Sequence, residues 1–401
     1  MKMPKTPLMR DEPDGSTGIV RWARNIGAAG LALFLMIGLA TNLREVLAHK
    51  IDLFPQSPSW PAFLDGKVTA GIASALSTAR LPVFAARTQR GLAWETLADM
   101  GPRVRQGCPG WLFIADELRL HPHGMADMTI RADVLARIRD LLKARGIDLL
   151  VVTVPDKTRI ETTHLCGLTR PGALVGRMRD WNALLARRGI DNVDLTPVLA
   201  AAARQGGRPV YLRTDTHWNE TGAAAAAAAA ADAVASRLQP EPPQEYRTRH
   251  EPVRYWPGDL LRLAGLDRWR AHRPLPAEQV TSSVFEEVEP AVAGTVAPDA
   301  SDLFGDVQAP NVALIGTSFS NNSGFGGFLE QHLHARVGRF AKDGGDFSGA
   351  AHDYFVGSAF RENPPQLLVW EIPERVLQLP DTQASRELPG LLDGRLRPME
   401  K

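Results

Sequence analysis

The segment 147–154 (IDLLVVTV) constrains the fold most, because it is a near-continuous apolar run. A strand with apolar side chains on both faces needs cover on both sides of its sheet, and helices supply that cover in parallel α/β proteins. Residues 132–145 have the periodicity of an amphipathic helix that ends at Gly146, a residue type common just after a helix. A helix followed by a buried strand predicts an α/β fold.

The same alternation continues along the chain. Further strands are expected over 110–114, 192–195, 311–316 and 366–372, and further helices over 173–188, 197–204, 223–238 and 323–333. Asn219 or Thr221 would cap the alanine-rich helix 223–238. Alternating strands and helices imply a mainly parallel sheet in a three-layer α/β/α domain. Residues 239–310, rich in proline and charge, are expected to form an insertion or long loop, and 381–401 a peripheral tail.

Residues 26–43 form an uncharged, mostly apolar run near the lower length limit for crossing a bilayer. Five basic residues precede it: Lys2, Lys5, Arg10, Arg21 and Arg24. This excess predicts a cytoplasmic tail over 1–25, a single-pass inner-membrane anchor over 26–45, a stalk over 46–104 and a periplasmic domain over 105–380. A cleavable signal peptide is the competing interpretation, but the run is long for one and residues 41–45 make a poor cleavage site.

The composition excludes several classes of protein. A net charge of +1 argues against a nucleic-acid-binding protein, because such proteins rely on a strong positive field. The chain has no Walker-type phosphate loop and no closely spaced cysteine motif, so neither a cofactor nor a metal is expected. The pairs His121/His123 and His332/His334 lack cysteine or acidic partners at ligand spacing and are predicted to be surface histidines.

Cys108 and Cys166 are the only cysteines of the chain. In the oxidising periplasm they can form a disulfide. Two free buried thiols are the alternative.

Two segments can carry chemistry. Ser318 follows the apolar strand 311–316, and a serine on a strand-to-helix turn is exposed beside backbone amides that can stabilise an oxyanion. A serine after a strand also often caps a helix, and Ser320 and Ser323 compete for the same role. Asp215 and His217 are two residues apart, a spacing at which side chains share a face of an extended segment. An aspartate can then orient the imidazole that deprotonates a serine, although a metal pair or a surface salt link would fit as well.

The string 215–223 (DTHWNETGA) resembles the hallmark motif of the AlgX/AlgJ family of polysaccharide O-acetyltransferases, and 316–320 (GTSFS) is similar to that family's nucleophile motif. Supporting matches are GWLF (110–113), VPDKTRI (154–160) and WEIPER (370–375). The resemblance spans roughly 105–380, and the N-terminal anchor fits the AlgJ-like branch. The sequence departs from the family at Glu161, where an aromatic residue is expected.

This resemblance implies an SGNH-hydrolase-like domain with circularly permuted catalytic motifs, because Asp215 and His217 precede Ser318. By motif position Ser318 is the nucleophile, His217 the general base and Asp215 its orienting partner. The implied partners are an exported polysaccharide, alginate or another exopolysaccharide, and a membrane-bound O-acyltransferase that brings the acetyl group across the inner membrane.

Other residues near these motifs are weaker candidates. The Ser318 amide is an expected oxyanion donor, Asn321 and Asn322 can add side-chain donors or form a turn, and Trp218 is a candidate substrate contact. Lys157 and Arg159 are candidates for contact with a polyanionic polymer or for a solvated loop, and Glu371 and Arg375 for a structural ion pair.

The motifs leave the reaction open in one respect. A deacetylating esterase of the same fold would share the acyl-enzyme, and a non-catalytic polysaccharide-binding subunit would share the fold alone. The sequence does not specify the polymer.

Overall fold

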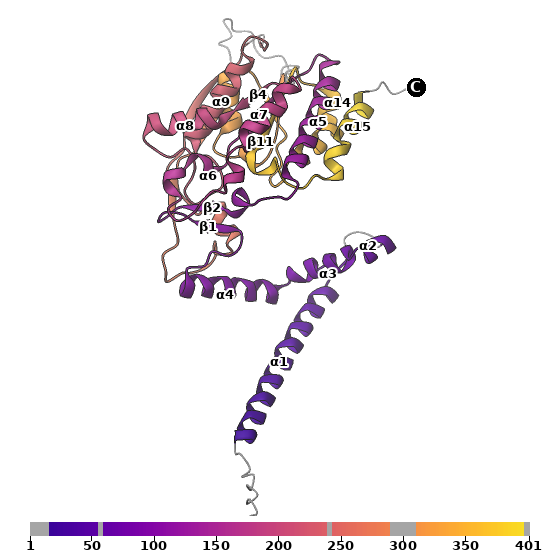
Figure 1. Cartoon of the computed structure of the whole chain (residues 1–401), viewed down its shortest axis with the longest axis vertical. Coiled ribbons are helices and arrows are strands. Elements are labelled where there is room, and N and C mark those ends of the chain that lie inside the picture. The colour runs from indigo at the N-terminus through magenta and orange to yellow at the C-terminus, as the bar shows by residue number, and fades with distance from the viewer. Residues whose placement is uncertain (1–15, 55–58, 239–242, 289–309, 397–401) are drawn as a thin grey trace, which may run out of the picture. The chain divides into compact units, whose positions relative to one another are not determined.

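The computed structural model describes residues 16–54, 59–238, 243–288 and 310–396 (Figure 1). The chain divides into two compact units, Met1–Leu92 and Ala93–Lys401. The described part of the first unit contains α1 (Ser16–Leu47), α2 (Trp60–Leu64), α3 (Lys67–Ser77) and most of α4 (Arg80–Leu97). The second unit therefore begins within the expected stalk, 46–104.

Helix α1 contains a stretch, Trp22–Leu47, that is long and apolar enough to cross a membrane. This finding fits the expected anchor. Helices α3 and α4 also pass the same test when taken together, but a bend of 76° separates them. Lys2, Lys5 and Arg10, which carry part of the topology prediction, lie outside the described residues.

Five parallel strands form the central sheet of the second unit, in the order β10-β9-β11-β3-β4. They are β3 (Asp148–Val154), β4 (Asn192–Asp194), β9 (Val312–Ile315), β10 (Val337–Arg339) and β11 (Leu367–Pro373). Strands β11 and β3 pair along their whole length, from Leu367 opposite Asp148 to Pro373 opposite Val154. Because the strands are parallel, their carboxyl ends meet at one edge, where open sheets bind ligands.

Helices cover both faces of this sheet, which confirms the three-layer α/β fold (Figure 1). One face carries α5 (Gly124–Lys143), α7 (Arg177–Arg187), α13 (Gly349–Val356), α14 (Ser358–Glu362) and α15 (Gln383–Leu396); the other carries α8 (Leu195–Gly206), α9 (Glu220–Val234) and α12 (Phe325–Leu333). Leu149 and Val151 of β3 enter the first core, whereas Leu150 and Val152 enter the second. The apolar run of β3 is therefore continuous because the strand is buried on both sides.

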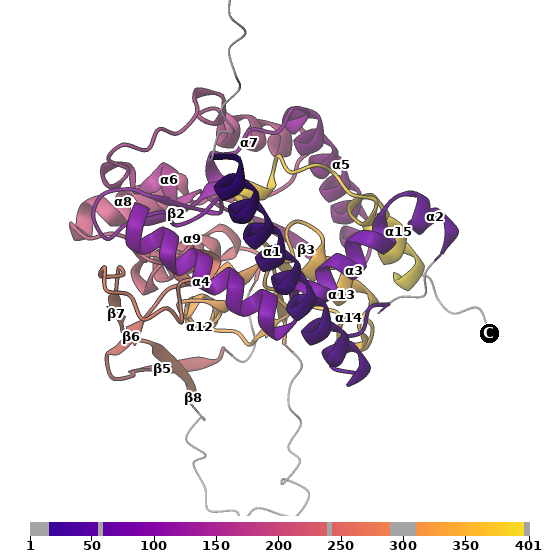
Figure 2. The ribbon, with the colours of Figure 1, turned by 90° about the horizontal axis from the view of Figure 1, so that it is seen from below.

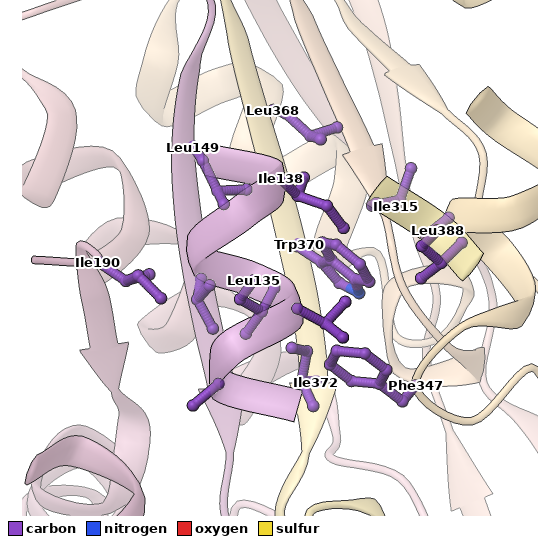
Figure 3. Close-up of a cluster of buried hydrophobic side chains, with 14 of the residues drawn as sticks. Leu135, Ile138, Leu149, Ile190, Ile315, Phe347, Leu368, Trp370, Ile372 and Leu388 are labelled. Carbon is purple, nitrogen blue, oxygen red and sulfur yellow. The ribbon is translucent and has the colours of Figure 1, made fainter. Parts of the chain in front are cut away.

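The two cores differ in their packing. In the first, Trp370 of β11 stacks on Phe347, with Leu135 and Ile138 of α5 nearby (Figure 3). In the second, α9 presents a face of small side chains to α8 and α12. Its buried alanines recur at helical spacing: Ala223, Ala226, Ala227, Ala230 and Ala231. Asn219 caps α9 by accepting the N–H of Gly222, as one of the two expected caps.

The segment 239–310 was expected to be an insertion or a long loop, and its described part is an insertion with helices and strands of its own. It contains β5 (Glu245–His250), β6 (Arg254–Trp256), α10 (Asp259–Leu263), β7 (Glu278–Val280) and β8 (Ser283–Val288). Strand β5 pairs with β8 beside α12, and β6 pairs with β7, both antiparallel (Figure 2). These strands are short and largely exposed, so they lack the apolar alternation that identifies a strand from sequence.

Two smaller expectations also change. The segment 381–401 was expected to be a peripheral tail. Its described part, up to residue 396, belongs to the core instead, because α15 packs on α5 and α13 and buries Leu388 and Leu392. Pro389 inside α15 interrupts the helical pattern in the sequence. The strand expected over 110–114 is β2 (Leu112–Ile114), which among the described strands pairs with β1 (Val104–Gln106) alone, in a separate antiparallel sheet.

Candidate active site

Ser318 lies at the carboxyl edge of the sheet, on the turn between β9 and the short helix α11 (Ser318–Asn321). Thr317 caps α11 by accepting the N–H of Phe319. The buried carboxylate of Glu371, on the neighbouring strand, accepts the N–H of Thr317 at 2.6 Å and the hydroxyls of Thr317 and Ser320 at 3.0 and 3.1 Å. Burial raises the pKa of Glu371, although these hydrogen bonds act to lower it. The turn is therefore fixed from both sides of the serine.

His217 lies next to Ser318, although 101 positions separate them in the sequence. Its Nε2 is 2.7 Å from Oγ of Ser318, and its Nδ1 is 2.5 Å from Oδ1 of Asp215. An ionised carboxylate can only accept, so Nδ1 carries the ring proton and Nε2 can accept the proton of the serine. An antiparallel bridge between Tyr211 and Trp218 closes the loop that holds Asp215 and His217. The structure brings the three predicted residues together.

The second oxygen of Asp215 is held by residues of the insertion. Oδ2 accepts the indole N–H of Trp256 and the backbone N–H of Asp259, both at 2.9 Å. Burial alone would raise the pKa of Asp215, but the hydrogen bond and charge of His217 and the N–H of Asp259 hold that pKa well below its usual range. Asp215 therefore stays ionised at neutral pH, with one oxygen directed at the imidazole.

Lys157 fixes the same loop through its backbone. The side chain is fully buried, and its Nζ donates to the carbonyl oxygens of Leu112, Arg213 and Asp215 at 2.7, 3.0 and 2.9 Å. Burial lowers the pKa of Lys157 to about 8 despite the acidic groups around it. The prediction that Lys157 contacts substrate is wrong, because the ammonium is already surrounded by protein.

Two carboxylates of the insertion also bind the loop. Glu278 of β7 accepts the backbone N–H groups of Arg213 and Thr214, both at 2.8 Å. Asp259 accepts the N–H and the hydroxyl of Thr216 at 2.7 and 2.6 Å. The loop 213–217 is thus held mainly by hydrogen bonds to distant segments.

Asp215, His217 and Asp259 place potential metal ligands within 4.8 Å of one another. The carboxylate oxygens of this group already accept hydrogen bonds from His217, Trp256 and Thr216. These bonds account for the cluster, and a cation would have to displace them.

Three neighbours of the predicted trio have structural partners. Trp218 is fully buried against Phe319 and Phe325, so the prediction that it contacts substrate is wrong. Asn322 donates its amide to the carbonyl oxygen of Ser318 at 2.7 Å, which is the turn-forming alternative. Asn321 donates to exposed Asp343 at 2.9 Å rather than toward Ser318.

Arg159 also binds the protein rather than facing a polymer. It donates to both oxygens of buried Glu374 at 2.8 and 2.6 Å, within a network that includes Arg170, Arg177 and Asp156. Arg159 is therefore directed into the protein by the buried carboxylate of Glu374, which follows β11.

The expected ion pair between Glu371 and Arg375 is absent from the described part of the chain. Glu371 accepts from Thr317 and Ser320 instead. The Arg375 guanidinium lies 5.2 Å from the centre of the Phe319 ring, a cation–π contact behind the serine turn.

Cys108 and Cys166 form a disulfide, which decides between the two alternatives left open by the sequence. The bond ties the segment before β2 to the loop that follows α6 (Lys157–Ile160). In that loop Glu161 is buried and accepts the backbone N–H groups of Val210 and Tyr211 at 2.9 and 3.1 Å. The carboxylate at Glu161, where the family's pattern has an aromatic residue, therefore holds the backbone just before the Asp215 loop.

A groove of about 680 Å³ runs beside the trio, between the insertion and the Ser318 turn. Trp256, which bonds Asp215, and Asn322, which bonds Ser318, both line it. Three guanidinium groups, from Arg208, Arg213 and Arg254, and two carboxylates, from Glu220 and Glu278, also line it. Glu220 accepts the hydroxyl of Ser283, and Glu278 accepts the backbone N–H groups of Arg213 and Thr214. The groove therefore offers net positive charge next to the serine, although the whole chain is nearly neutral.

The parallel sheet, the strand-end serine and the aspartate–histidine loop define an SGNH-hydrolase-like α/β protein in which the serine comes last. The chain belongs to the AlgX acetyltransferase family, because the family model "SGNH hydrolase-like domain, acetyltransferase AlgX" matches residues 104–374. The probable alginate O-acetylase AlgJ of Pseudomonas aeruginosa is 35% identical over 291 residues, which cover 69% of this chain and 71% of that protein.

Solved structures agree with this membership. The O-acetyltransferase domain of Pseudomonas putida AlgJ superposes with a TM-score of 0.60 at 27% identity, covering 73% of this chain and all of that domain. Pseudomonas aeruginosa AlgX gives a TM-score of 0.52 at 23% identity, covering 72% of this chain and 67% of that protein, and shows the shared fold. The chain is thus an acetyltransferase-family protein with an N-terminal helix fit for a membrane anchor.

Sequence reasoning missed Trp256 and Asp259 as residues that hold the trio in place, and it gave Glu371 a different partner, Arg375. Trp256 and Asp259 lie in the string 256–260 (WPGDL), and Glu371 lies in the string 370–375 (WEIPER). The available signal was an acidic residue next to tryptophan, glycine or proline in each of these strings. Nothing local in the sequence identifies their partners.

Proposed function

We propose that the chain transfers acetyl groups, through a covalent ester on Ser318, to hydroxyl groups of an exported polysaccharide in the periplasm. The observation that carries this proposal is the hydrogen-bonded line from Asp215 through His217 to Ser318. It supports the roles of orienting acid, general base and nucleophile, in that order. Family membership supports the acetyl group as the transferred unit.

The reaction proceeds in two balanced steps. Oγ of Ser318 attacks the acetyl carbonyl of the donor while its proton passes to Nε2 of His217, and the donor's leaving group departs with that proton. A sugar hydroxyl then attacks the acetyl-serine ester, gives its proton to His217, and the proton returns to Ser318 as the ester breaks. Asp215 stabilises the imidazolium in both steps.

The acceptor proposed is alginate or a related uronate polysaccharide. Relatives of this chain carry the names probable alginate O-acetylase and alginate biosynthesis protein. The groove supports the same choice, because Arg208, Arg213 and Arg254 offer planar donor pairs suited to carboxylates. A neutral polysaccharide would gain little from these three side chains.

The donor side of the proposal rests on topology. Acetyl-CoA is a cytoplasmic metabolite, so a serine in the periplasm needs a membrane-bound O-acyltransferase that passes the acetyl group across the inner membrane. Helix α1 supports this arrangement by tethering the domain to that membrane.

A transfer assay separates the transferase from the esterase. The purified full chain receives an activated acetyl ester and an oligouronate, and both acetylated oligomer and free acetate are quantified. We expect acetylated oligomer to appear, and its yield to fall with loss of the groove arginines in Arg208→Gln and Arg254→Gln. Release of acetate alone would assign the chain to the esterases.

Single substitutions test the roles within the trio. Ser318→Ala, His217→Ala and Asp215→Ala should each abolish acetyl transfer to the oligomer, while circular dichroism verifies that each variant folds. Ser323→Ala, whose hydroxyl donates to the carbonyl oxygen of Trp218, serves as the control serine of the same segment. Polymer acetylation that persists in folded Ser318→Ala would support the non-catalytic binding subunit instead.

A further inference from the structure

We infer that a groove at the carboxyl end of α1 binds the phosphate headgroup of an anionic phospholipid. The groove has a volume of about 410 Å³ and lies within the first unit, between the end of α1 and the start of α4. The inference rests on the proposed membrane anchorage by α1, and it is independent of acetyl transfer.

The position of the groove along α1 matches the expected edge of the bilayer. The apolar run ends at residue 43, and Thr41, two residues inside that end, lines the groove together with Leu81 and Phe84 of α4. The run of 18 residues is about 27 Å long as a helix, close to the thickness of the hydrocarbon layer. A site that begins at Thr41 and continues past Arg44 therefore lies at headgroup depth.

Glu45 joins the two helices at this depth. Its carboxylate oxygens accept the backbone N–H of Arg80 at 3.3 and 3.4 Å, and the Arg80 Nε lies 3.9 Å away. These contacts hold the start of α4 against the end of α1. The groove between them is therefore formed before a lipid binds.

The charges around the groove favour an anion. Arg44, Lys50 and Arg80 line it, and all three are exposed. Glu45 is the one acidic residue in the lining, and its oxygens already accept from Arg80. Three cations against one engaged carboxylate match a phosphate at the membrane surface.

Exposed aromatic side chains of α2 and α4 suit contact with the acyl chains of the lipid. Phe84 is 66% exposed although it lines the groove. Trp60 and Phe63 of α2 stack on each other and are 71% and 52% exposed. Aromatic side chains beside basic ones are typical of the boundary between lipid and water.

Lipid binding is measured on the full chain in vesicles of phosphatidylethanolamine with phosphatidylglycerol. After extraction in a mild detergent, native mass spectrometry counts the phosphatidylglycerol molecules retained by each variant. We expect Arg44→Gln, Lys50→Gln and Arg80→Gln each to weaken retention about fivefold, as for a cation next to an anionic surface. Arg87→Gln, an exposed arginine of α4 outside the groove, should retain lipid like the parent chain.

A depth measurement tests the geometry independently. Because Cys108 and Cys166 are bonded to each other, Phe84→Cys carries the single free thiol of the chain and can be labelled with a nitroxide. We expect the label to be more accessible to oxygen than to a water-soluble nickel complex, with Gln89→Cys on the same helix closer to water. A water-accessible Phe84→Cys label would overturn the proposal and leave the surface to a protein partner.

The remaining outcomes are also decisive. Labels that reach the bilayer centre along α3 would mean that α3 and α4 form a re-entrant pair, and the headgroup site would be wrong. Retention of inorganic phosphate in place of phosphatidylglycerol would mean a soluble anion site. Resistance of the chain to alkaline washing reports the anchorage, and acetyl transfer by the same preparation reports the proposed function, so the three failures are distinguishable.

Discussion

Both carboxylate oxygens of Asp215 accept hydrogen bonds. One accepts from His217, and the other accepts from Trp256 and the backbone of Asp259. A carboxylate with one free oxygen could rotate and offer the imidazole a poorer geometry. The indole N–H therefore fixes the orientation of the Asp215 carboxylate, although Trp256 lies 41 positions away in the sequence.

Replacing the indole tests this role. Trp256→Phe removes the N–H but keeps an aromatic ring, and we expect acetyl transfer to slow by about tenfold, the effect of one lost hydrogen bond to a charged group. Tyr255→Phe, an exposed neighbour, is the matched control. An unchanged rate of acetyl transfer in Trp256→Phe would assign the ring to packing alone.

Lys157 makes a prediction about stability against pH. Its folded pKa of about 8 lies below the unfolded value of about 10.4, so between these values the unfolded chain binds more protons. The contribution of Lys157 to the free energy of unfolding therefore rises with pH across this window and is constant below it. Urea unfolding of the parent chain at a series of pH values should show the rise, and Lys157→Met should lack it.

The same variant should also be less stable at neutral pH. Methionine leaves three carbonyl oxygens without the ammonium donor, a cost of about 3 kcal/mol or more. Arg87→Met, at an exposed position, controls for loss of a positive charge. Equal stability of Lys157→Met and the parent would show that water replaces the ammonium.

At the scale of elements, the turn that enters α10 positions the site through its backbone. Gly258 has a φ of 69° and a ψ of 151°, a conformation that is essentially restricted to glycine. A Cβ at this position would lie 2.1 Å from the carbonyl oxygen of Thr214, inside the loop that holds Asp215. The loop can therefore pack against this turn only if residue 258 has no side chain.

Gly258→Ala should shift the turn, weaken the contacts of Trp256 and Asp259 with Asp215, and reduce both stability and acetyl transfer. Gly207→Ala is the control, because Gly207 also has a positive φ, of 57°, but no other segment lies within 4 Å of the position that its Cβ would take. We expect a loss of about 2 kcal/mol for Gly258→Ala from strain and overlap together, and about half of that for the control. Similar losses in thermal unfolding would show that the overlap is relieved without cost.

The elements differ in how far the sequence predicts them. Strand β3 and helix α9 follow from local patterns, because apolar runs and alanine spacing record burial directly. Strands β5 to β8 do not, since they are short, lack an apolar alternation and pair with distant partners. The trio was predictable from its motifs, whereas Trp256, Glu278 and Glu371 act through contacts that no local pattern records.

At the scale of the whole molecule, one covalent bond links two segments that both support the Asp215 loop. The disulfide between Cys108 and Cys166 spans 58 positions. On one side of it Leu112 accepts from Lys157, and on the other Glu161 binds the backbone of Tyr211. The bond therefore restricts the unfolded chain near the segments that assemble the site.

Loss of the disulfide should lower the stability of the whole second unit. Chain-entropy arguments give a cost of about 4 kcal/mol for a loop of this length. We expect the double variant Cys108→Ser with Cys166→Ser, and the parent chain in a thiol reductant, to unfold at equally lower urea concentrations. Addition of the reductant to the double variant should have no further effect, which controls for action at other sites. If the reduced and oxidised chains unfold together, the native contacts of Lys157 and Glu161 already hold these segments, and the disulfide is not needed for folding.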